Sequence, residues 1–244
     1  MDPDWIRPEW PAPPNVRSMS TTRSGGVSRG AYASLNLGQH VGDSPDSVAT
    51  NRSKLQASLG RAEPRWLSQV HGTRVAMLGG MPVTQPADAA VAAVPGEACV
   101  VMTADCLPVT FCDRRGTAVA AAHAGWRGLS AGVLETTLES MGVAPEDVLA
   151  WMGPAIGPQA YEVGGEVRDA FVRHSAPAAQ AFSAGKAPGK WWCDLYMLAR
   201  QRLEAAGVKD VYGGRFCTFT DKERFFSFRR DGQCGRMATL IWIE

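Results

Sequence analysis

Short apolar runs alternate with segments of helical pattern along most of the chain. Five runs have the length of β-strands, at 98–102 (ACVVM), 107–111 (LPVTF), 117–122 (TAVAAA), 148–152 (VLAWM) and 238–243 (ATLIWI). Four segments carry helix signals, at 45–59, 132–141, 165–174 and 195–206. Ser44 and Asp194 precede the first and last of these as N-caps, and Gly60 follows the first as a stop signal.

The order of these segments predicts one α/β (α+β) domain. Helices and strands are interleaved, but their spacing is too irregular for regular βαβ units, so we expect a mixed β-sheet flanked by helices. The proline-rich start predicts an extended N-terminal arm at 1–15, which leaves 16–244 as a single domain. The segment SAPAAQAFSAGKAPGK at 175–190 predicts a long surface excursion.

Charge and composition narrow the choice of partner. The chain has 25 Lys and Arg against 24 Asp and Glu, so no basic field favours nucleic acid or an anionic membrane. No apolar run approaches the roughly 18 residues of a membrane span, and no signal-peptide pattern is present. The six cysteines include no C-x-x-C pair, which favours reduced thiols. We therefore expect a cytoplasmic protein that acts on a small molecule.

Two reactive side chains stand where apolar runs end. Cys106 precedes the LPVTF run, and His123 follows the TAVAAA run. If the two runs form a hairpin about DRRG, Cys112 pairs with Thr117 and Cys106 lies directly opposite His123. Opposed Cβ atoms are roughly 4.5 to 5.5 Å apart, within reach of a shared metal ion or a thiolate–imidazole hydrogen bond. The alternative is that Cys106 is a buried, small hydrophobic residue.

The chain has four histidines. His174 falls late in a polar helix and is expected at the surface, whereas His40 is expected to form hydrogen bonds within its loop. His71 stands where a strand meets a glycine. It is either a packed loop residue or a side chain that projects from a sheet edge into a cleft.

Six motifs follow one another along the chain: SLNLGQHVGD, QVHGT, TADCLPV, HAGWRG, GPAIGPQAYEVG and FFSFRRDGQCGR. Together they resemble the YfiH family, also described as laccase-domain proteins, purine nucleoside phosphorylases or peptidoglycan-editing factors, from about residue 16 to the end. The resemblance implies a single α/β domain with a mixed sheet and one zinc ion held by His71, Cys106 and His123. Cys234 departs from the family pattern, in which a threonine is usual.

The resemblance implies two activities that require different side chains. Three N and S ligands fit tetrahedral zinc and leave a fourth position open for water, as in catalytic sites. Zinc-activated water accounts for the adenosine deamination that the resemblance implies, although the H-x-E and P-C-x-x-C signature of zinc deaminases is absent. Phosphorolysis, the other implied activity, requires cationic donors for phosphate, and Arg127 and the pair Arg229 and Arg230 are the candidates. The alternative is a solvated turn arginine, which is favoured more for Arg230 than for Arg127.

Other polar residues have less specific assignments. Glu162 lies in a Gly- and Pro-rich segment before a helix and is either a general base or a capping carboxylate. Asp105 either hydrogen-bonds a ligating imidazole or fixes its turn. Arg23 and Asn36 lie in a glycine-rich stretch without the spacing of a phosphate-binding loop. We expect this stretch to shape the cleft and these two residues to contact substrate.

Three functions compete for these residues. The first is a zinc-dependent enzyme that phosphorolyses adenosine, inosine and methylthioadenosine and deaminates adenosine, with Cys106, His123, Arg127 and Glu162 in the reaction. The second is a cysteine hydrolase that edits a peptidoglycan precursor, with Cys106 as nucleophile and His123 as base. The third is a multicopper polyphenol oxidase (laccase), whose copper sites need more imidazoles than four histidines supply. We therefore predict one Zn²⁺ per chain rather than copper.

Overall fold

The strands of this computed structural model, which describes residues 4–80 and 83–244, form three sheets. The six-stranded sheet has the order β12 (Asp210–Gly213), β8 (Val148–Met152), β6 (Leu107–Asp113), β7 (Val119–Ala124), β4 (Ala89–Ala92) and β3 (Val75–Met77). The four-stranded sheet has the order β1 (Val16–Ser20), β13 (Met237–Ile243), β5 (Glu97–Thr103) and β2 (Glu63–Arg65). The third has the order β10 (Phe182–Ala184), β11 (Lys190–Cys193) and β9 (Glu162–Gly164). The predicted mixed α/β domain is confirmed, but its strands divide among three sheets instead of one.

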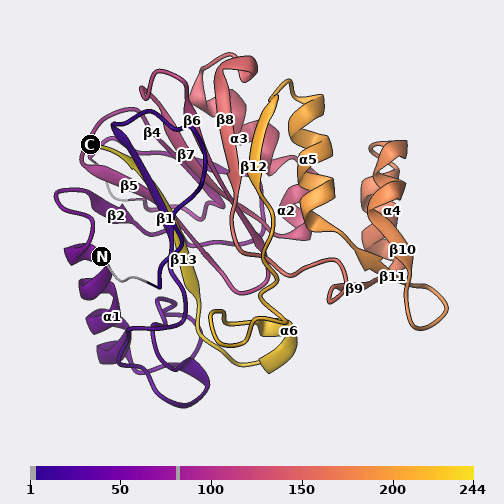
Figure 1. Cartoon of the computed structure of the whole chain (residues 1–244), viewed down its shortest axis with the longest axis horizontal. Helices are drawn as coiled ribbons and strands as arrows, with labels where there is room; N and C mark the ends of the chain where they lie inside the picture. Colours follow the sequence, from indigo (N-terminus) through magenta and orange to yellow (C-terminus); the bar gives the residue numbers. More distant parts are fainter. Residues whose placement is uncertain (1–3, 81–82) are drawn as a thin grey trace.

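The two larger sheets pack face to face between helices (Figure 1). Residues of β5 and β13, such as Val101 and Ile241, meet β7 and β8 in one buried cluster. On the outer face of the four-stranded sheet, Leu55 of α1 (Pro45–Ala57) packs against Val100 and Leu240. Helices α3 (Val133–Met141) and α5 (Leu195–Ala205) cover the outer face of the six-stranded sheet. Both faces of the central strands are therefore buried, which is why their sequences are continuous apolar runs.

All four predicted helices are present, and two short ones were not predicted. The helix predicted at 165–174 is α4 (Gly165–Val172), and Asp194 caps α5 by accepting a hydrogen bond from the amide of Met197. Ser44 is the N-cap residue of α1, but its side chain makes no capping hydrogen bond. The additional helices, α2 (Trp126–Ala131) and α6 (Phe228–Asp231), are too short for a periodic pattern. No helix within the described residues is long and apolar enough to cross a membrane.

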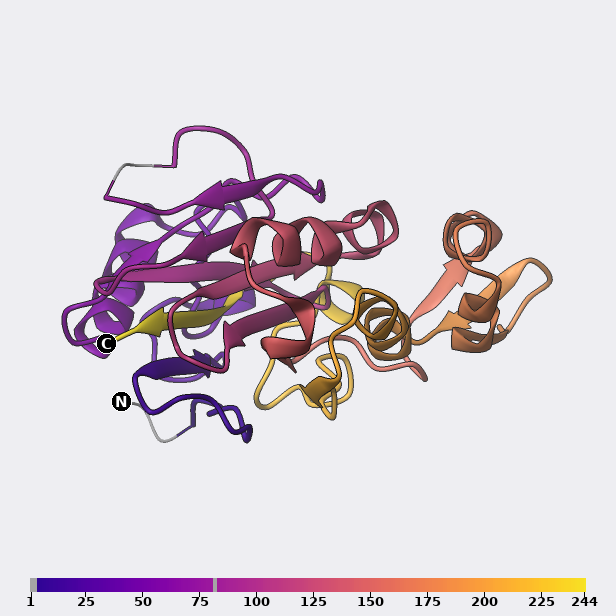
Figure 2. The ribbon, with the colours of Figure 1, turned by 90° about the horizontal axis from the view of Figure 1, so that it is seen from above.

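The segment 175–190 lies mostly at the surface, as predicted, and it has a defined structure. It holds the 3₁₀-helix Ala176–Ala181 and the strand β10, which pairs with β11. Figure 2 shows this small sheet and α4 projecting from one end of the molecule. At the other end of the sequence, Trp5 is buried against the four-stranded sheet and Ile6 forms a β-bridge with Ser20.

The hairpin of β6 and β7 has a different register from the predicted one. Cys112 pairs with Val119 instead of Thr117, and Pro108, not Cys106, pairs with His123. The carboxylate of Asp113 accepts hydrogen bonds from the amides of Thr117 and Ala118 and from the Thr117 hydroxyl, which closes a longer turn. The prediction that Cys106 lies directly opposite His123 is therefore wrong.

A single hydroxyl ties α5 to the loop after β8. Buried Tyr196 accepts a hydrogen bond from the amide of Ala155 over 2.8 Å, and its oxygen lies 3.1 Å from the carbonyl of Gly153 and 3.0 Å from that of Phe216. We predict that Tyr196→Phe lowers the free energy of unfolding by about 1–3 kcal/mol, because it leaves these buried groups without a partner. Urea denaturation measures this loss. Tyr212→Phe is the matched control, since its hydroxyl contacts only half-buried Asp210 over 3.4 Å, and an equal loss in both variants would contradict the assignment.

Candidate metal centre

His71 lies in the loop between β2 and β3, whose shape is set by a buried carboxylate. Its φ of 60° is left-handed, a conformation that a non-glycine residue adopts rarely. The backbone amides of 70–72 all donate to the carboxylate of Asp88, over 2.7 to 3.1 Å. The residue before these amides, Gln69, is also held in place, because its side-chain amide exchanges two hydrogen bonds with the backbone of Met102.

The same carboxylate orients His123 near the end of β7. His123 Nδ1 and Asp88 Oδ1 are 2.8 Å apart, and both side chains are almost fully buried. Burial raises the pKa of Asp88, but the hydrogen bonds from His123 and the loop amides outweigh this effect and lower it. Because the carboxylate occupies Nδ1, Nε2 is the nitrogen of His123 that is available to a metal.

Cys106 lies in the turn between β5 and β6, directly after a strained residue. Asp105 has a φ of 90°. Its carboxylate accepts hydrogen bonds from the hydroxyl of Thr218 and the amide of Arg229, both over 2.6 Å. Of the two roles considered for Asp105, the structure supports the fixing of its turn, while the imidazole partner is Asp88.

The three side chains form a group that can hold a metal ion. The ligand atoms of His71, Cys106 and His123 all lie within 4.8 Å of one another. Cys106 Sγ is 3.7 Å from His71 Nε2, whereas tetrahedral zinc separates a sulfur and a nitrogen ligand by about 3.6 Å. One thiolate and two imidazoles are also donors that zinc prefers. The residues therefore fit zinc with three protein ligands; we call them the ligand trio.

Two glycines of the HAGWRG motif allow the trio to assemble. A Cβ at Gly125 would lie 2.7 Å from His71 Cδ2 and 3.0 Å from Cys106 Sγ. A Cβ at Gly128 would lie 2.8 Å from the carbonyl oxygen of Gly72. Any side chain at these positions would push the His71 loop away from β7 and α2.

Electrostatics favour a thiolate in the trio. Burial raises the pKa of the Cys106 thiol, but His123 and His71 outweigh this effect and lower it. Burial lowers the pKa of His123, but the Cys106 thiolate and Asp88 outweigh this effect and raise it. Since a thiolate is the form that binds metal, the site needs little free energy to deprotonate its cysteine ligand.

Two cavities open beside the trio and share His71, Cys106 and Phe228. The first, which we call the Arg236 cavity, has a volume of about 340 Å³, and its lining includes His40, Gln69, Met102, His123 and Arg236. The second, the Arg229 cavity, has a volume of about 230 Å³, and its lining includes Trp126, Arg127, Tyr161, Leu195 and Arg229. The trio is thus accessible from two sides that both carry an arginine.

Of the arginines considered for phosphate, Arg127 and Arg229 line the Arg229 cavity, whereas the carboxylate of Glu162 is engaged elsewhere. Arg127 is exposed and lies over the ring of Trp126, with 4.4 Å from Cζ to the ring centroid. Arg229 lies over the ring of Tyr161 and donates to the backbone oxygen of Glu162. The carboxylate of Glu162 accepts a hydrogen bond from the amide of Lys186, in the turn between β10 and β11, over 2.6 Å.

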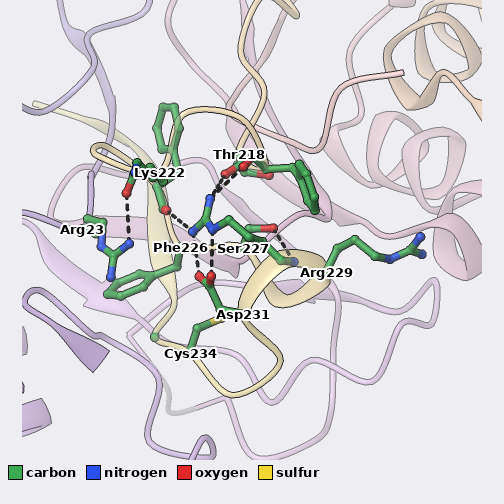
Figure 3. Close-up of polar contacts among 12 residues, drawn as sticks. Arg23, Thr218, Lys222, Phe226, Ser227, Arg229, Asp231 and Cys234 are labelled. Carbon is green, nitrogen blue, oxygen red and sulfur yellow. Dashed lines mark hydrogen bonds and ion pairs between the residues drawn. The ribbon is translucent and has the colours of Figure 1, made fainter. Parts of the chain in front are cut away.

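The other predicted residues lie apart from the trio or within the scaffold. Arg23 donates to the backbone oxygens of Ala33 and Lys222 in a shallow depression elsewhere on the surface. Figure 3 shows Arg23 and Arg229 on opposite sides of Asp231. Arg230 is not solvated: it pairs with Asp231 and donates to three backbone oxygens, of Thr218, Phe219 and Phe225. Asn36 is fully buried and bonds to neighbouring backbone and to Asp43.

The sequence analysis missed Asp88 and Arg236. Asp88 immediately precedes an apolar run, AAVA, that was too short to be predicted as a strand. Arg236 is the last residue of the FFSFRRDGQCGR motif, and no local pattern distinguishes it from Arg229 and Arg230 in the same motif. A carboxylate flanked by alanines is a signal that could have drawn attention to Asp88, because an isolated buried charge requires partners.

Comparisons with known proteins agree with this description. Residues 17–244 match the family described as multi-copper polyphenol oxidoreductase laccase. The chain is 56% identical over 240 residues to a Pseudomonas aeruginosa protein named purine nucleoside phosphorylase, and 55% identical to purine nucleoside phosphorylase YfiH of Escherichia coli, with 98% of each chain covered. A crystal structure of a Neisseria meningitidis protein has a TM-score of 0.94 and 52% identity, with 99% of each chain covered. YlmD from Geobacillus stearothermophilus has a TM-score of 0.87 and 32% identity, with 98% of this chain and 96% of that chain covered.

The fold and site together define a mixed α/β protein whose His, Cys and His side chains can hold a metal beside two cavities. The matches extend over nearly the whole chain and therefore span all the segments that carry the trio and line the two cavities. The chain belongs to the YfiH family of laccase-domain proteins.

We predict that Asp88→Asn weakens zinc binding by about 10- to 100-fold, as expected for loss of the carboxylate behind a ligating histidine. Competition with a chromophoric chelator measures this affinity, and circular dichroism checks that the variant is folded. Asp113→Asn is the matched control, because Asp113 is also a buried acceptor of backbone amides but lies at the far turn of the β6–β7 hairpin. Equal zinc affinity in the two variants would contradict the role assigned to Asp88.

Proposed function

We propose that the protein is a zinc-dependent purine nucleoside phosphorylase that also deaminates adenosine. The observation that carries this proposal is the ligand trio beside a cavity that combines aromatic rings with two arginines. Relatives named purine nucleoside phosphorylase, at 55 and 56% identity, support phosphorolysis of purine nucleosides. The substrates that we propose are adenosine, inosine and methylthioadenosine. The six cysteines are free thiols, consistent with a cytoplasmic location.

In the proposed reaction, the arginines bind phosphate and the rings bind the base. Arg127 and Arg229 offer forked donors to phosphate oxygens, and Trp126 and Tyr161 offer faces to a purine. The C1′–N9 bond breaks and an oxygen of hydrogen phosphate bonds to C1′, while the departing purine takes up the proton that the phosphate loses and leaves as the neutral base. Zinc, when bound by the trio, supplies Lewis acidity that activates water near neutral pH, as deamination requires. Glu162 has no part in this proposal because its carboxylate is engaged with Lys186.

The donor set favours zinc over several copper ions. Within the described residues, the trio is the only group of three or more His, Cys, Asp or Glu side chains placed to share a metal. It contains two imidazoles, and multicopper sites for oxygen reduction need more. We therefore propose one zinc ion per chain.

A second candidate function, cysteine hydrolysis of a peptidoglycan precursor, uses the same residues without a metal. Asp88 holds His123 through Nδ1. The ligand atom of this imidazole and the sulfur of Cys106 lie within 4.8 Å of each other. This is the order of groups in a cysteine nucleophile, its base and an orienting carboxylate. The metal content and the role of His71 separate the two candidates.

We predict that adenosine with phosphate yields adenine and ribose 1-phosphate, with inosine as a side product. Chromatography of reactions with and without phosphate measures both activities. Arg127→Ala should reduce phosphorolysis roughly tenfold to hundredfold, because it removes charged donors from phosphate, and should affect deamination less. Arg115→Ala, at the far turn of the β6–β7 hairpin, is the control and should change neither. An equal loss of both activities in Arg127→Ala would mean that Arg127 maintains the site instead of binding phosphate.

We predict that iodoacetamide modifies Cys106 only after a chelator has removed the metal. A coordinated thiolate has its lone pair engaged, whereas a hydrolase nucleophile must react in the native protein. Cys217 is the internal reference, since it is partly exposed and hydrogen bonds lower the pKa of its thiol against the effect of burial. Peptide mass spectrometry should show equal modification of Cys217 in both states.

Substitution of His71 completes this test. In the zinc-dependent reaction, His71→Ala lowers zinc content and abolishes both nucleoside activities, because one of three ligands is lost. A dyad of Cys106 and His123 does not need His71. Full activity in His71→Ala, with rapid alkylation of Cys106 in untreated protein, would refute the three-ligand site and leave the hydrolase.

A further inference from the structure

The Arg236 cavity gathers positive charge without an acidic residue to balance it. Its lining includes Arg236 and His40 but no aspartate or glutamate. Arg52 stands behind this lining, with its guanidinium 3.7 Å from the sulfur of Met102. Within residues 4–80 and 83–244, neither arginine forms an ion pair: their hydrogen bonds go to backbone oxygens and to sulfur.

Arg236 and His40 supply donors to the cavity, and Arg52 supplies a charge behind it. Arg236 uses Nη1 to bond the backbone oxygens of Cys234 and Gly235, over 2.9 and 3.0 Å, which leaves Nε and Nη2 without a partner among the described residues. Burial lowers the pKa of Arg52 to about 10, so it stays charged at neutral pH. Burial, with the charges of Arg236 and Arg52, lowers the pKa of His40. His40 is therefore a neutral donor beside two guanidinium groups.

The loop around Arg236 is built to hold it in place. Buried Asn36 accepts hydrogen bonds through Oδ1 from the amides of both Gly38 and Arg236, each over 2.9 Å. A Cβ at Gly38 would lie 2.8 Å from Arg236 Cγ, so the glycine makes room for the arginine. Asn36 is thus a positioning residue that joins the segment bearing His40 to the one bearing Arg236.

We propose that the Arg236 cavity is a binding subsite for an oxyanion, either inorganic phosphate or a phosphate ester of the substrate. Arg236 offers two free donor groups, His40 adds a third, and the Arg52 charge strengthens the field in a partly buried site. The cavity shares His71 and Cys106 with the Arg229 cavity, so an anion bound here lies next to the trio. As part of a nucleoside reaction, this subsite rests on the proposed function.

Isothermal titration of the zinc-loaded protein with inorganic phosphate and, separately, with adenosine 5′-monophosphate tests the proposal. Arg236→Met should weaken binding of at least one anion by about tenfold or more, as expected for lost charged hydrogen bonds. His40→Gln, at an exposed position, should weaken the same anion by a smaller factor. Arg61→Met removes a charge from an exposed loop away from both cavities and should change neither affinity. Zinc analysis of each variant confirms that the trio is intact.

The pattern of losses identifies the source of the anion. Weaker binding of inorganic phosphate assigns the co-substrate to this subsite in place of Arg127 and Arg229, whereas a loss confined to the nucleotide assigns the subsite to a phosphate ester. Unchanged affinities for both anions in Arg236→Met and His40→Gln, or no binding of either anion by the unmodified protein, would overturn the subsite.

Failure of the subsite and failure of the proposed function give different results. If Arg236→Met phosphorolyses adenosine with an unchanged phosphate KM and binds both anions with unchanged affinity, the subsite proposal is wrong and the phosphorylase proposal stands. If the protein binds an anion through Arg236 but does not phosphorolyse adenosine, the phosphorylase proposal is wrong and the cavity is an oxyanion site for another reaction.

Discussion

The buried carboxylate of Asp88 is the constraint on which the site depends. It accepts hydrogen bonds from the three amides of 70–72 and pairs with Nδ1 of His123. A carboxylate without exposure to water is tolerated only when such partners surround it. Because one carboxylate accepts hydrogen bonds from both segments, the His71 loop and the end of β7 are fixed relative to each other. Two of the three candidate ligands are therefore placed by a residue that does not itself belong to the trio.

The position of the site follows from the layered fold. The central strands are covered on both faces, by the partner sheet and by helices, so polar side chains can reach a cavity only where the strands end. Cys106 precedes β6, His123 lies near the end of β7, and α2 starts directly after Gly125. The close approach of these segments requires glycine at 125 and 128, since a side chain at either position would collide with the His71 loop.

Local charge differs from what the composition suggested. A net charge of +1 gave no reason to expect anions, yet both cavities beside the trio carry arginine. Net charge averages over the surface, whereas binding depends on a few side chains within about one Debye length, roughly 8 to 10 Å. The fold concentrates these arginines at one place although acidic residues balance them in the whole chain.

The sequence by itself determined the four long helices, the five central strands and the identity of the candidate ligands. Caps, stop signals and buried runs act within a few residues, and the ligand motifs are contiguous. Only the tertiary structure decided the register set by Asp113 at the hairpin turn and the carboxylate that Asp88 provides. It also decided that Asn36 supports Arg236 and that the Glu162 carboxylate is held by the turn between β10 and β11. Each of these depends on contacts between segments far apart in the chain, where a shift of two residues changes the partner without changing any local pattern.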